Sequence, residues 1–379
     1  MADATINEND IKNNGGTNQM IIYLVILVLI YIWGVIFLNK YKNRKYFLTL
    51  SFSTMALVLG LRASTVGEDT LHYINIFKIS KSLSYSKIVK GVTETVYATQ
   101  WGVDRKIENG YILLNKLISI LTDNEQWIIF IVAGLTCCLF ARFIYRNTKH
   151  VFFATQVFLC ESLYMNSFNL MRQMLAMSIA LNAYELLKEK KYKKAIIVFV
   201  IAFLFHKSSI VLLVLLPLCA INDYQRTIKY VAFGAIMVNI LVPIISKAVS
   251  KLIPRYSEYF YVNYWTVDVN GTMILWGIEI ALCILIYFKG INDKDTFVAV
   301  ACTMLYLSLD ILGLKISSFS RVALYFRSFL ILLFPLFIPY IQKRSKNRLW
   351  YQLIIIIILT GAYLSYARTD VRAYQFFWK

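Results

Sequence analysis

Long apolar runs separated by short polar segments dominate the chain. The strongest runs cover residues 20–38, 47–61, 127–145, 151–167, 170–187, 229–246, 271–288, 296–312, 322–341 and 349–366. A helix rises about 1.5 Å per residue, so roughly 20 apolar residues cross the hydrocarbon core of a bilayer. The pattern therefore predicts an all-α polytopic membrane protein with about ten transmembrane helices.

The apolar run 195–221 differs from the others. The polar residues His206-Lys207-Ser208-Ser209 interrupt it and leave two segments of 11 and 12 residues. Each segment is shorter than the ~17 residues that a spanning helix needs. We therefore expect either a re-entrant hairpin or two short helices, with the polar residues at the tip, and the pattern leaves both forms open.

The composition agrees with a helical membrane protein. Hydrophobic residues make up 59% of the 379 residues and charged residues 16%, whereas the 15 glycines and 5 prolines are few enough to favour helices over barrel strands. The six cysteines lie in or beside apolar runs, so no disulfide framework is expected. The net charge of +19 comes from Lys and Arg in short bursts between the runs. A nucleic-acid-binding protein would instead gather its basic residues on one exposed face.

The basic bursts predict the orientation of the chain. With the acidic N-terminus outside, the inner loops are 40–46, 142–150, 188–194, 222–229, 289–295 and 343–348, and they hold half of the 40 basic residues. This distribution follows the positive-inside rule. It places Lys190, Lys294 and Arg344 in the cytoplasm.

Three regions follow from this topology. Residues 1–19 are expected to form a disordered polar tail, 20–366 a single transmembrane catalytic domain, and 367–379 an extracytoplasmic tail. Two long outer loops, 62–126 and 247–270, belong to the middle region, and loops of such length usually carry function. Within the first, Tyr111 to Leu121 is expected to form an interfacial helix.

Polar side chains collect at the predicted outer ends of the helices. They are Arg62, Asp69 and Tyr73 after the second span, Glu108 before the interfacial helix, Asn169, Arg172 and Gln173 at one helix end, His206 and Lys207 at the interruption, and Arg321, Tyr325 and Arg327 at another helix start. Charged groups at one membrane depth are costly to hold near lipid, so they indicate a buried site or a water-filled cavity.

Taken singly, several of these residues also fit purely structural roles. A helix-end arginine such as Arg172 or Arg321 can extend to the lipid headgroups, and His206 can be satisfied by backbone. Glu161 and Glu279 either line the cavity or pair with a neighbouring helix. The three histidines lack metal-ligand spacing and there is no phosphate-binding glycine loop, so we expect no metal and no cofactor.

Five short motifs occur in order along most of the chain. They are Arg62 with Gly67-Glu68-Asp69-Thr70 and Tyr73, then Glu108-Asn109-Gly110-Tyr111, then Asn169 with Arg172-Gln173, then Phe205-His206-Lys207-Ser208-Ser209, and then Arg321 with Tyr325-Phe326. Together they resemble the EpsG branch of the Wzy-type bacterial exopolysaccharide polymerases, which also build O-antigen and capsule. The resemblance covers residues from about 50 to 341.

The resemblance implies a glycosyltransferase in the bacterial cytoplasmic membrane, with its active site on the extracytoplasmic side. It would transfer a growing glycan from undecaprenyl diphosphate onto a second undecaprenyl-diphosphate-linked oligosaccharide, the repeat unit. Membrane lipid, a flippase and a chain-length regulator are the expected partners, and nucleic acid is not. A lipid-linked glycan ligase, a transporter or flippase, and a membrane O-acyltransferase are the alternatives.

The chemistry of that transfer suits the polar residues. Breaking the anomeric C–O bond passes through an oxocarbenium-like state and leaves negative charge on the diphosphate. Guanidinium groups bind phosphate oxygens in pairs and can stabilise that charge without a metal, and we assign this role to Arg62, Arg172, Arg321 and Arg327. His206, Asp69 or Glu108 could deprotonate the acceptor hydroxyl. Tyr73, Asn169, Gln173, Lys207 and Tyr325 are the expected substrate-binding residues.

Overall fold

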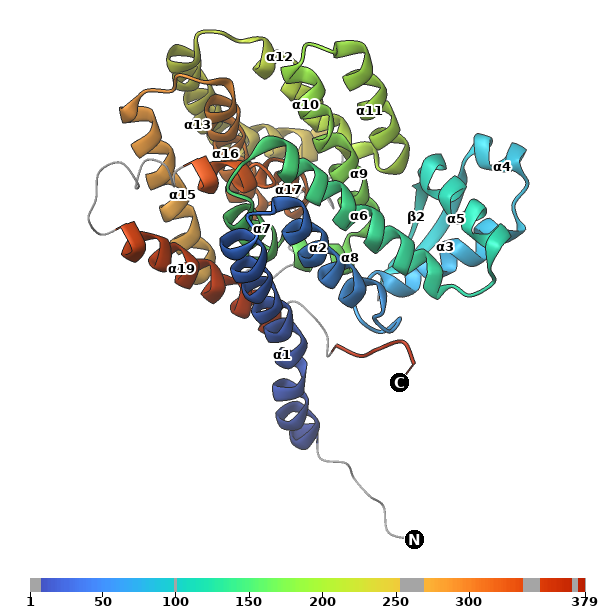
Figure 1. Cartoon of the computed structure of the whole chain (residues 1–379). Helices are drawn as coiled ribbons and strands as arrows, with labels where there is room; N and C mark the ends of the chain where they lie inside the picture. The colour runs from blue at the N-terminus through green and yellow to red at the C-terminus, as the bar shows by residue number, and fades with distance from the viewer. Residues whose placement is uncertain (1–7, 99–100, 253–268, 337–347, 370–373, 379) are drawn as a thin grey trace.

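The computed structural model describes residues 8–98, 101–252, 269–336, 348–369 and 374–378. These residues form a bundle of helices with a smaller lobe on one side (Figure 1). A two-stranded antiparallel sheet is the only β-structure other than a single bridge within these ranges. The all-α polytopic class predicted from the sequence therefore fits the structure.

The first part of the chain builds one wall of the bundle and the lobe. Its elements are α1 (Glu8–Trp33), η1 (Gly34–Lys40), α2 (Arg44–Gly60), α3 (Thr70–Ser82), α4 (Tyr85–Lys90), β1 (Val92–Ala98), β2 (Trp101–Ile107), α5 (Asn109–Leu121) and α6 (Gln126–Asn147). Helix α1 begins at Glu8, although we expected a disordered tail through residue 19. Once an apolar run has nucleated a helix, extending it costs little per residue, so α1 continues past its apolar part.

The second part of the chain fills the centre and the far wall. Its elements are α7 (Val151–Cys160), α8 (Leu163–Asn169), α9 (Met171–Leu181), α10 (Ala183–Lys188), α11 (Tyr192–Phe205), η2 (Lys207–Val214), α12 (Leu215–Ala220), α13 (Tyr224–Leu252), α15 (Val269–Lys289), α16 (Lys294–Gly313), α17 (Ser317–Arg327) and α19 (Arg348–Thr369).

The predicted count of ten spans is not confirmed. Five helices among the described residues are long and apolar enough to cross a membrane: Ile21–Lys40, Gln126–Asn147, Tyr224–Lys247, Thr272–Lys289 and Lys294–Gly313. A sixth span results if Ser318–Arg327 and Leu330–Leu336, which meet at a bend of 42°, are taken together. The predicted span 322–341 and the inner loop 343–348 lie partly outside the described residues, as does most of the 247–270 loop.

Breaks inside two continuous apolar runs explain part of the difference. The run 151–167 divides into α7 and α8 at Ser162, whose φ is 56°. The run 170–187 divides into α9 and α10 at Asn182. Helix breaks at membrane depth are tolerated where protein surrounds them, because neighbouring groups satisfy the backbone. These helices are almost entirely buried, so the surrounding bundle permits the breaks.

The run 195–221 breaks at the position that its polar residues predict. Helix α11 ends at Phe205, His206 has an extended backbone, and the 3-10 helix η2 starts at Lys207. Helix α12 then completes the run. Two short helical segments therefore meet at His206.

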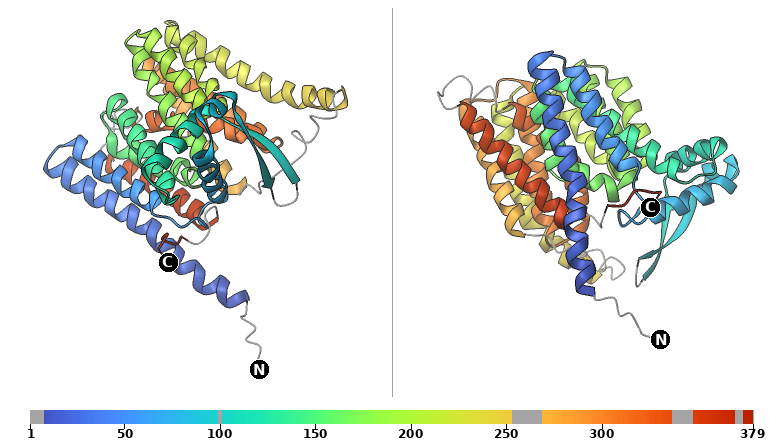
Figure 2. Two further views of the ribbon diagram at one scale, coloured as in Figure 1. Left: turned by 90° about the vertical axis from the view of Figure 1, so that its right-hand side faces the viewer. Right: turned by 60° about the horizontal axis from the view of Figure 1, so that its bottom comes forward.

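The lobe is made by residues 70–121 of the long segment 62–126. Helices α3 and α5 pack together over a hydrophobic core that includes Tyr73, Phe77, Tyr111 and Ile118 and that residues of α6 and α9 complete. The expected helix at Tyr111 to Leu121 is present as α5. The β1–β2 hairpin pairs Val92 with Ile107 and extends away from the helical bundle (Figure 2).

The last described residues return to the end of α2. Ala63 N–H donates to the Gln375 carbonyl at 2.7 Å, and Phe377 N–H donates to the Leu61 carbonyl at 3.0 Å. The phenol of Tyr374 donates to the Val58 carbonyl at 2.8 Å. This short β-bridge fastens residues 374–378, part of the predicted C-terminal tail, beside Arg62.

Candidate active site

Glu108 joins two of the predicted site residues. One carboxylate oxygen lies 2.6 Å from Nη1 of Arg172, and the other lies 3.2 Å from Nδ1 of His206. The backbone N–H of Lys207 also donates to Glu108, at 3.2 Å. Three elements that are distant in the sequence, α5, α9 and η2, therefore meet at one carboxylate.

A glycine allows Glu108 to approach His206. Gly110 lies in the first turn of α5, and a β-carbon there would be 2.7 Å from the carbonyl oxygen of Leu204. Side chains do not approach backbone that closely, so only glycine fits against the end of α11. Glu108, two residues before Gly110, is thereby held beside His206, two residues after Leu204.

Arg172 lies over a floor of two tyrosines. Its guanidinium carbon is 5.9 Å from the ring centroids of both Tyr73 and Tyr111. The side chain is 13% exposed, and its Nε has no hydrogen-bond partner among the described residues. Because a guanidinium carries five N–H donors in a fixed plane, Arg172 keeps donors for a ligand while it is paired with Glu108.

His206 is held with one ring nitrogen toward the carboxylate. Its Nδ1 is at ion-pair distance from Glu108, although the two groups lack the alignment of a hydrogen bond. A carboxylate beside Nδ1 favours the tautomer with the proton on that atom. The lone pair of Nε2 then remains to accept a proton from another group.

The ionisation of Glu108 follows from the same contacts. Burial by itself raises the pKa of its carboxyl, but the contact with His206 and the positive charge of Arg172 outweigh burial and lower the pKa to about 2. Glu108 is therefore a carboxylate at any pH near neutrality. A group with so low a pKa is a weak proton acceptor, which favours a holding role over that of a general base.

Helix α17 contributes the opposite side of the site. The Gln173 side-chain amide donates to the Arg321 carbonyl at 2.6 Å, and the hydroxyl groups of Ser208 and Tyr325 are 2.9 Å apart. The Arg321 side chain has no carboxylate at ion-pair distance within the described part of the chain. The Gln173 contact brings α17 beside the start of α9, and the charges of both Arg321 and Arg172 act on the Tyr73 hydroxyl.

The loop before α3 is fixed to the end of α8. The Oδ1 atom of Asn169 accepts the Glu68 N–H at 2.9 Å, and its carbonyl accepts the Tyr73 hydroxyl at 3.2 Å. Gly67 has a φ of 90° and lies against the Phe168 carbonyl, where no side chain fits. Asp69 follows at the start of α3, partly exposed and without a capping hydrogen bond.

Arg62 does not reach this site. Its side chain is completely buried, and it donates to the carbonyls of Leu59 at 2.6 Å and Phe168 at 3.1 Å. The last carbonyls of a helix lack partners within the helix, so Arg62 satisfies the end of α2 and joins it to α8. The expectation that Arg62 shares a site with the other arginines is not met by this geometry.

Arg327 belongs to a second, buried cluster. It pairs with Glu161 at 2.9 Å and lies over the Tyr306 ring at 5.2 Å. Glu279 is close enough for its charge to act on this pair, and neither of its carboxylate oxygens has a hydrogen-bond partner among the described residues. The sequence placed Arg321 and Arg327 together, but six residues of helix separate them by about 9 Å and place them on different faces.

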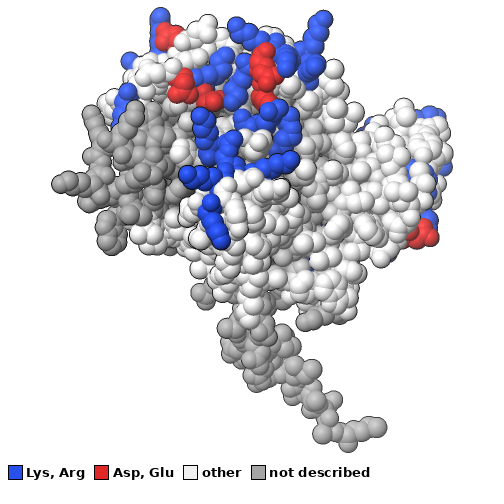
Figure 3. All heavy atoms as spheres, viewed as in Figure 1, with Lys and Arg blue, Asp and Glu red and all other residues white. Residues whose placement is uncertain are grey.

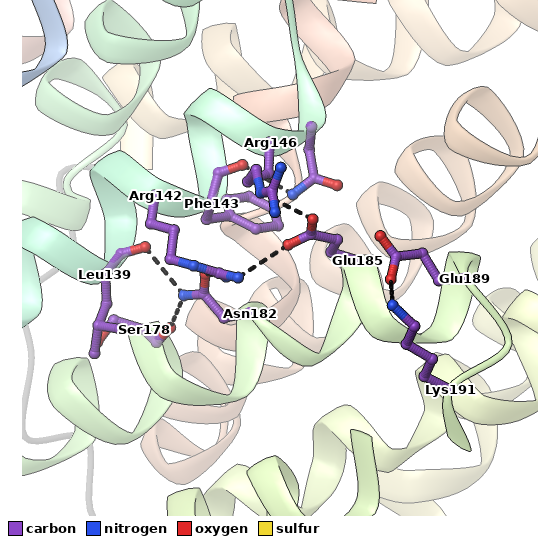
Figure 4. Close-up of polar contacts among 10 residues, drawn as sticks. Leu139, Arg142, Phe143, Arg146, Ser178, Asn182, Glu185, Glu189 and Lys191 are labelled. Carbon is purple, nitrogen blue, oxygen red and sulfur yellow. Dashed lines mark hydrogen bonds and ion pairs between the residues drawn. The ribbon is translucent and has the colours of Figure 1, made fainter. Parts of the chain in front are cut away.

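The opposite end of α9 is anchored by a polar network (Figure 4). Arg142 and Arg146 of α6 contact Glu185 at 3.1 and 2.9 Å. The Asn182 amide donates to the carbonyls of Leu139 and Ser178, at 3.0 and 2.8 Å (Figure 4). Helix α9 is thus fixed at both ends, which keeps Arg172 in register with Glu108.

Two residues of the site were not predicted from the sequence. Tyr111 lies beneath Arg172, and Ser208 contacts Tyr325. Both belong to the five ordered motifs. Tyr111 directly follows Gly110 and Ser208 directly follows Lys207, so their positions in the motifs could have indicated them. In the described part of the chain, no three His, Cys, Asp or Glu side chains are arranged to hold a metal ion.

Comparison with protein-family models identifies the chain. The EpsG family model matches residues 45–378, which is nearly the whole chain. The chain therefore belongs to the EpsG family, as its motifs predicted. Comparison with curated proteins and with solved structures found no match. Family membership and the long apolar helices together indicate a membrane polysaccharide polymerase of the glycosyltransferase type.

Proposed function

We propose that this member of the EpsG family polymerises lipid-linked repeat units at the outer face of the bacterial cytoplasmic membrane. The growing glycan leaves undecaprenyl diphosphate and joins a hydroxyl of the repeat unit on a second carrier. The observation that carries the proposal is the Glu108 carboxylate, which holds His206 on one side and Arg172 on the other. A proton acceptor and an anion-binding group thereby face one site.

Arg172 and Arg321 bind the donor diphosphate. As the anomeric C–O bond breaks, its electron pair stays with the phosphate oxygen and the leaving group gains negative charge. Guanidinium groups that are already positioned stabilise this charge without reorganisation. Arg172 is fixed by Glu108 and the two tyrosines, and Arg321 lies on another helix. The two can therefore hold one diphosphate from two sides.

His206 activates the acceptor. Its Nε2 takes the proton of the acceptor hydroxyl as the oxygen forms the new bond to the anomeric carbon. The resulting imidazolium is stabilised by the Glu108 carboxylate, which remains ionised because its pKa is about 2. Asp69, which is partly exposed at the start of α3, is the other candidate for this role. The sugar stacks and hydrogen-bonds among Tyr73, Asn169, Gln173, Lys207 and Tyr325.

The charge distribution supports an outward-facing site. In the view of Figure 3, basic side chains gather over the upper part of the molecule. Arg172 lies in the first turn of α9, and the other end of this helix leads to Asn182 and the Arg142–Glu185 network, next to the basic segments 142–150 and 188–194. Under the positive-inside rule these segments face the cytoplasm. Ten residues of helix, a rise of about 15 Å, separate Asn182 from Arg172, so we expect Arg172 to lie toward the outer side.

Reconstituted protein tests the proposal. Purified wild-type chain supplied with lipid-linked repeat units should extend them, whereas His206→Ala should be slower by roughly 10²–10⁴-fold if His206 is the general base. Lys193→Gln, an exposed change near the opposite end, is the control and should retain full activity. A smaller loss in His206→Ala would show that His206 is not the general base, and Asp69→Asn would then be the next variant to test.

Deletion in the native host tests the reaction class. Loss of polymerisation should leave single repeat units on the carrier lipid, which mass spectrometry of the lipid extract would detect. Accumulation of full-length polymer on the carrier would instead identify a glycan ligase. A flippase would leave repeat units inaccessible from outside, and an acyltransferase would leave chain length unchanged.

A further inference from the structure

A second concave site lies near the opposite end of α2 from Arg62. The turn between η1 and α2 faces the turn between α6 and α7 across a cavity of about 330 Å³. Four basic side chains line it: Lys42, Arg44, Lys149 and His150. Among the described residues, none of those lining it is acidic. Small-molecule sites in proteins are roughly 300–1,000 Å³, so this cavity has room for a small charged group.

The cavity is held by contacts between its two walls. Arg44 donates to the Thr148 carbonyl at 3.2 Å and lies over the Tyr145 ring at 5.3 Å. Lys42 has a φ of 49°, a left-handed conformation that a lysine rarely adopts. The next residue, Asn43, caps α2 by accepting the Tyr46 N–H at 3.2 Å. The capped turn before α2 therefore fixes the backbone that carries Lys42 and Arg44.

The start of α7 forms another wall of the cavity. Val151, Phe152 and Phe153 are its first three residues, and all line the cavity. The first N–H groups of a helix have no intrahelical partner, and the helix dipole makes this end favourable for an anion. Cationic side chains and a helix N-terminus together match the chemistry of a phosphate group.

Apolar side chains occupy the same cavity as the basic ones. Leu38 and Phe152 face it from the two walls. A free phosphate ion gains nothing from contact with apolar side chains. A phospholipid headgroup is attached to acyl chains, which such side chains can bind. Basic segments can set the orientation of a membrane protein without forming a cavity. Here the basic residues line a cavity, which indicates a binding role as well.

We propose that this cavity binds the phosphate headgroup of an anionic phospholipid. The lipid would belong to the inner leaflet, because the segments 40–46 and 142–150 are the basic ones that the positive-inside rule places in the cytoplasm. The headgroup lies among Lys42, Arg44 and Lys149, and an acyl chain passes along Leu38 and Phe152. Such a lipid would bridge α2 and α7 at the end remote from His206.

Binding of short-chain lipids to the purified full-length chain in detergent tests the proposal. The probes are dioctanoyl phosphatidylglycerol, dioctanoyl phosphatidylcholine and inorganic phosphate, and the measured quantity is the Kd by thermophoresis. The test variant is Lys42→Gln/Lys149→Gln, which leaves Arg44 and its bond to Thr148 in place. The control, Lys193→Gln/Lys194→Gln, removes the same charge from exposed positions outside the cavity.

Phosphatidylglycerol should bind most tightly, and the test variant should weaken it by roughly ten- to thirtyfold, as expected for two lysines near an anionic headgroup. The control should change the Kd less than twofold. Equal binding of phosphatidylcholine, or equal weakening in the two double variants, would overturn the proposal. Inorganic phosphate with the same Kd as phosphatidylglycerol would identify a free-anion site and refute the lipid assignment.

Discussion

Replacing Glu108 with Gln removes one charge and nearly preserves the shape of the side chain. The carboxylate contacts Arg172 at 2.6 Å and His206 at 3.2 Å, and its side chain is only 7% exposed. We expect the turnover rate to fall by roughly 10²–10⁴-fold, since an amide can neither stabilise an imidazolium nor favour the correct tautomer of His206. KM for the donor should change less, because Arg172 keeps its own charge.

The variant should also lose stability in a pH-dependent way. Folding lowers the pKa of Glu108 from 4.5 to about 2, so the carboxylate stabilises the native state fully above pH 4.5. The size of this contribution is about 3 kcal/mol. It is lost as the pH falls through 2. Glu108→Gln lacks it, and the stability difference from wild type should therefore shrink as the pH is lowered from 6 to 3.

The assays are chain extension in proteoliposomes and thermal unfolding in detergent across that pH range. Glu125→Gln is the matched control, because Glu125 pairs with Lys78 at 3.2 Å on an exposed surface and should change neither quantity. Glu108→Asp should recover part of the rate, since the charge returns one bond further from His206. Wild-type turnover in Glu108→Gln, at equal protein levels, would refute the role of Glu108 in holding His206.

Three further predictions concern the arginines, the topology and the metal. Arg172→Lys should be strongly impaired in chain extension, because lysine keeps the charge but loses the planar fork of the guanidinium. Arg62→Lys should mainly lower the melting temperature, since Arg62 donates to two carbonyls inside the fold. Equal activity of Arg172→Lys and wild type would count against diphosphate binding. Cysteines introduced at 190 and 294 should react only with reagent on the cytoplasmic side, and one at 69 only from outside, so external labelling at 190 would reject the orientation. Chain extension should continue in excess chelator, and its loss with rescue by Mg²⁺ would show that a metal is required.

The sequence predicted those features that depend on local pattern. The polar residues at 206–209 mark the break between α11 and η2, and the Glu108-Asn109-Gly110 motif marks the start of α5. The hairpin, which was not predicted, also has a local signal, because the β-branched and aromatic residues of 92–97 are typical of a strand. The helix breaks at Ser162 and Asn182 have none, since they depend on the protein that surrounds them.

The four arginines Arg62, Arg172, Arg321 and Arg327 lie in environments with different neighbouring charges. Their positions in the sequence do not reveal this difference. Arg172 and Arg321 share one neighbourhood with the buried carboxylate of Glu108 and the partly exposed one of Asp69. Of the two arginines, only Arg172 is ion-paired among the described residues, so Arg321 keeps its charge for a ligand.

The buried cluster has an excess of carboxyl groups. Arg327 pairs with Glu161, and the carboxyl groups of Glu279 and Asp310 also act on it. One guanidinium among three carboxyl groups has no surplus positive charge to offer, and a diphosphate placed there would be repelled by any second ionised carboxylate. Arg62 is unavailable for another reason, because its guanidinium is completely buried and donates to two backbone carbonyls. Of the four arginines assigned to the diphosphate, we therefore expect Arg172 and Arg321 to bind it, because Arg327 is paired among carboxyl groups and Arg62 is enclosed by backbone.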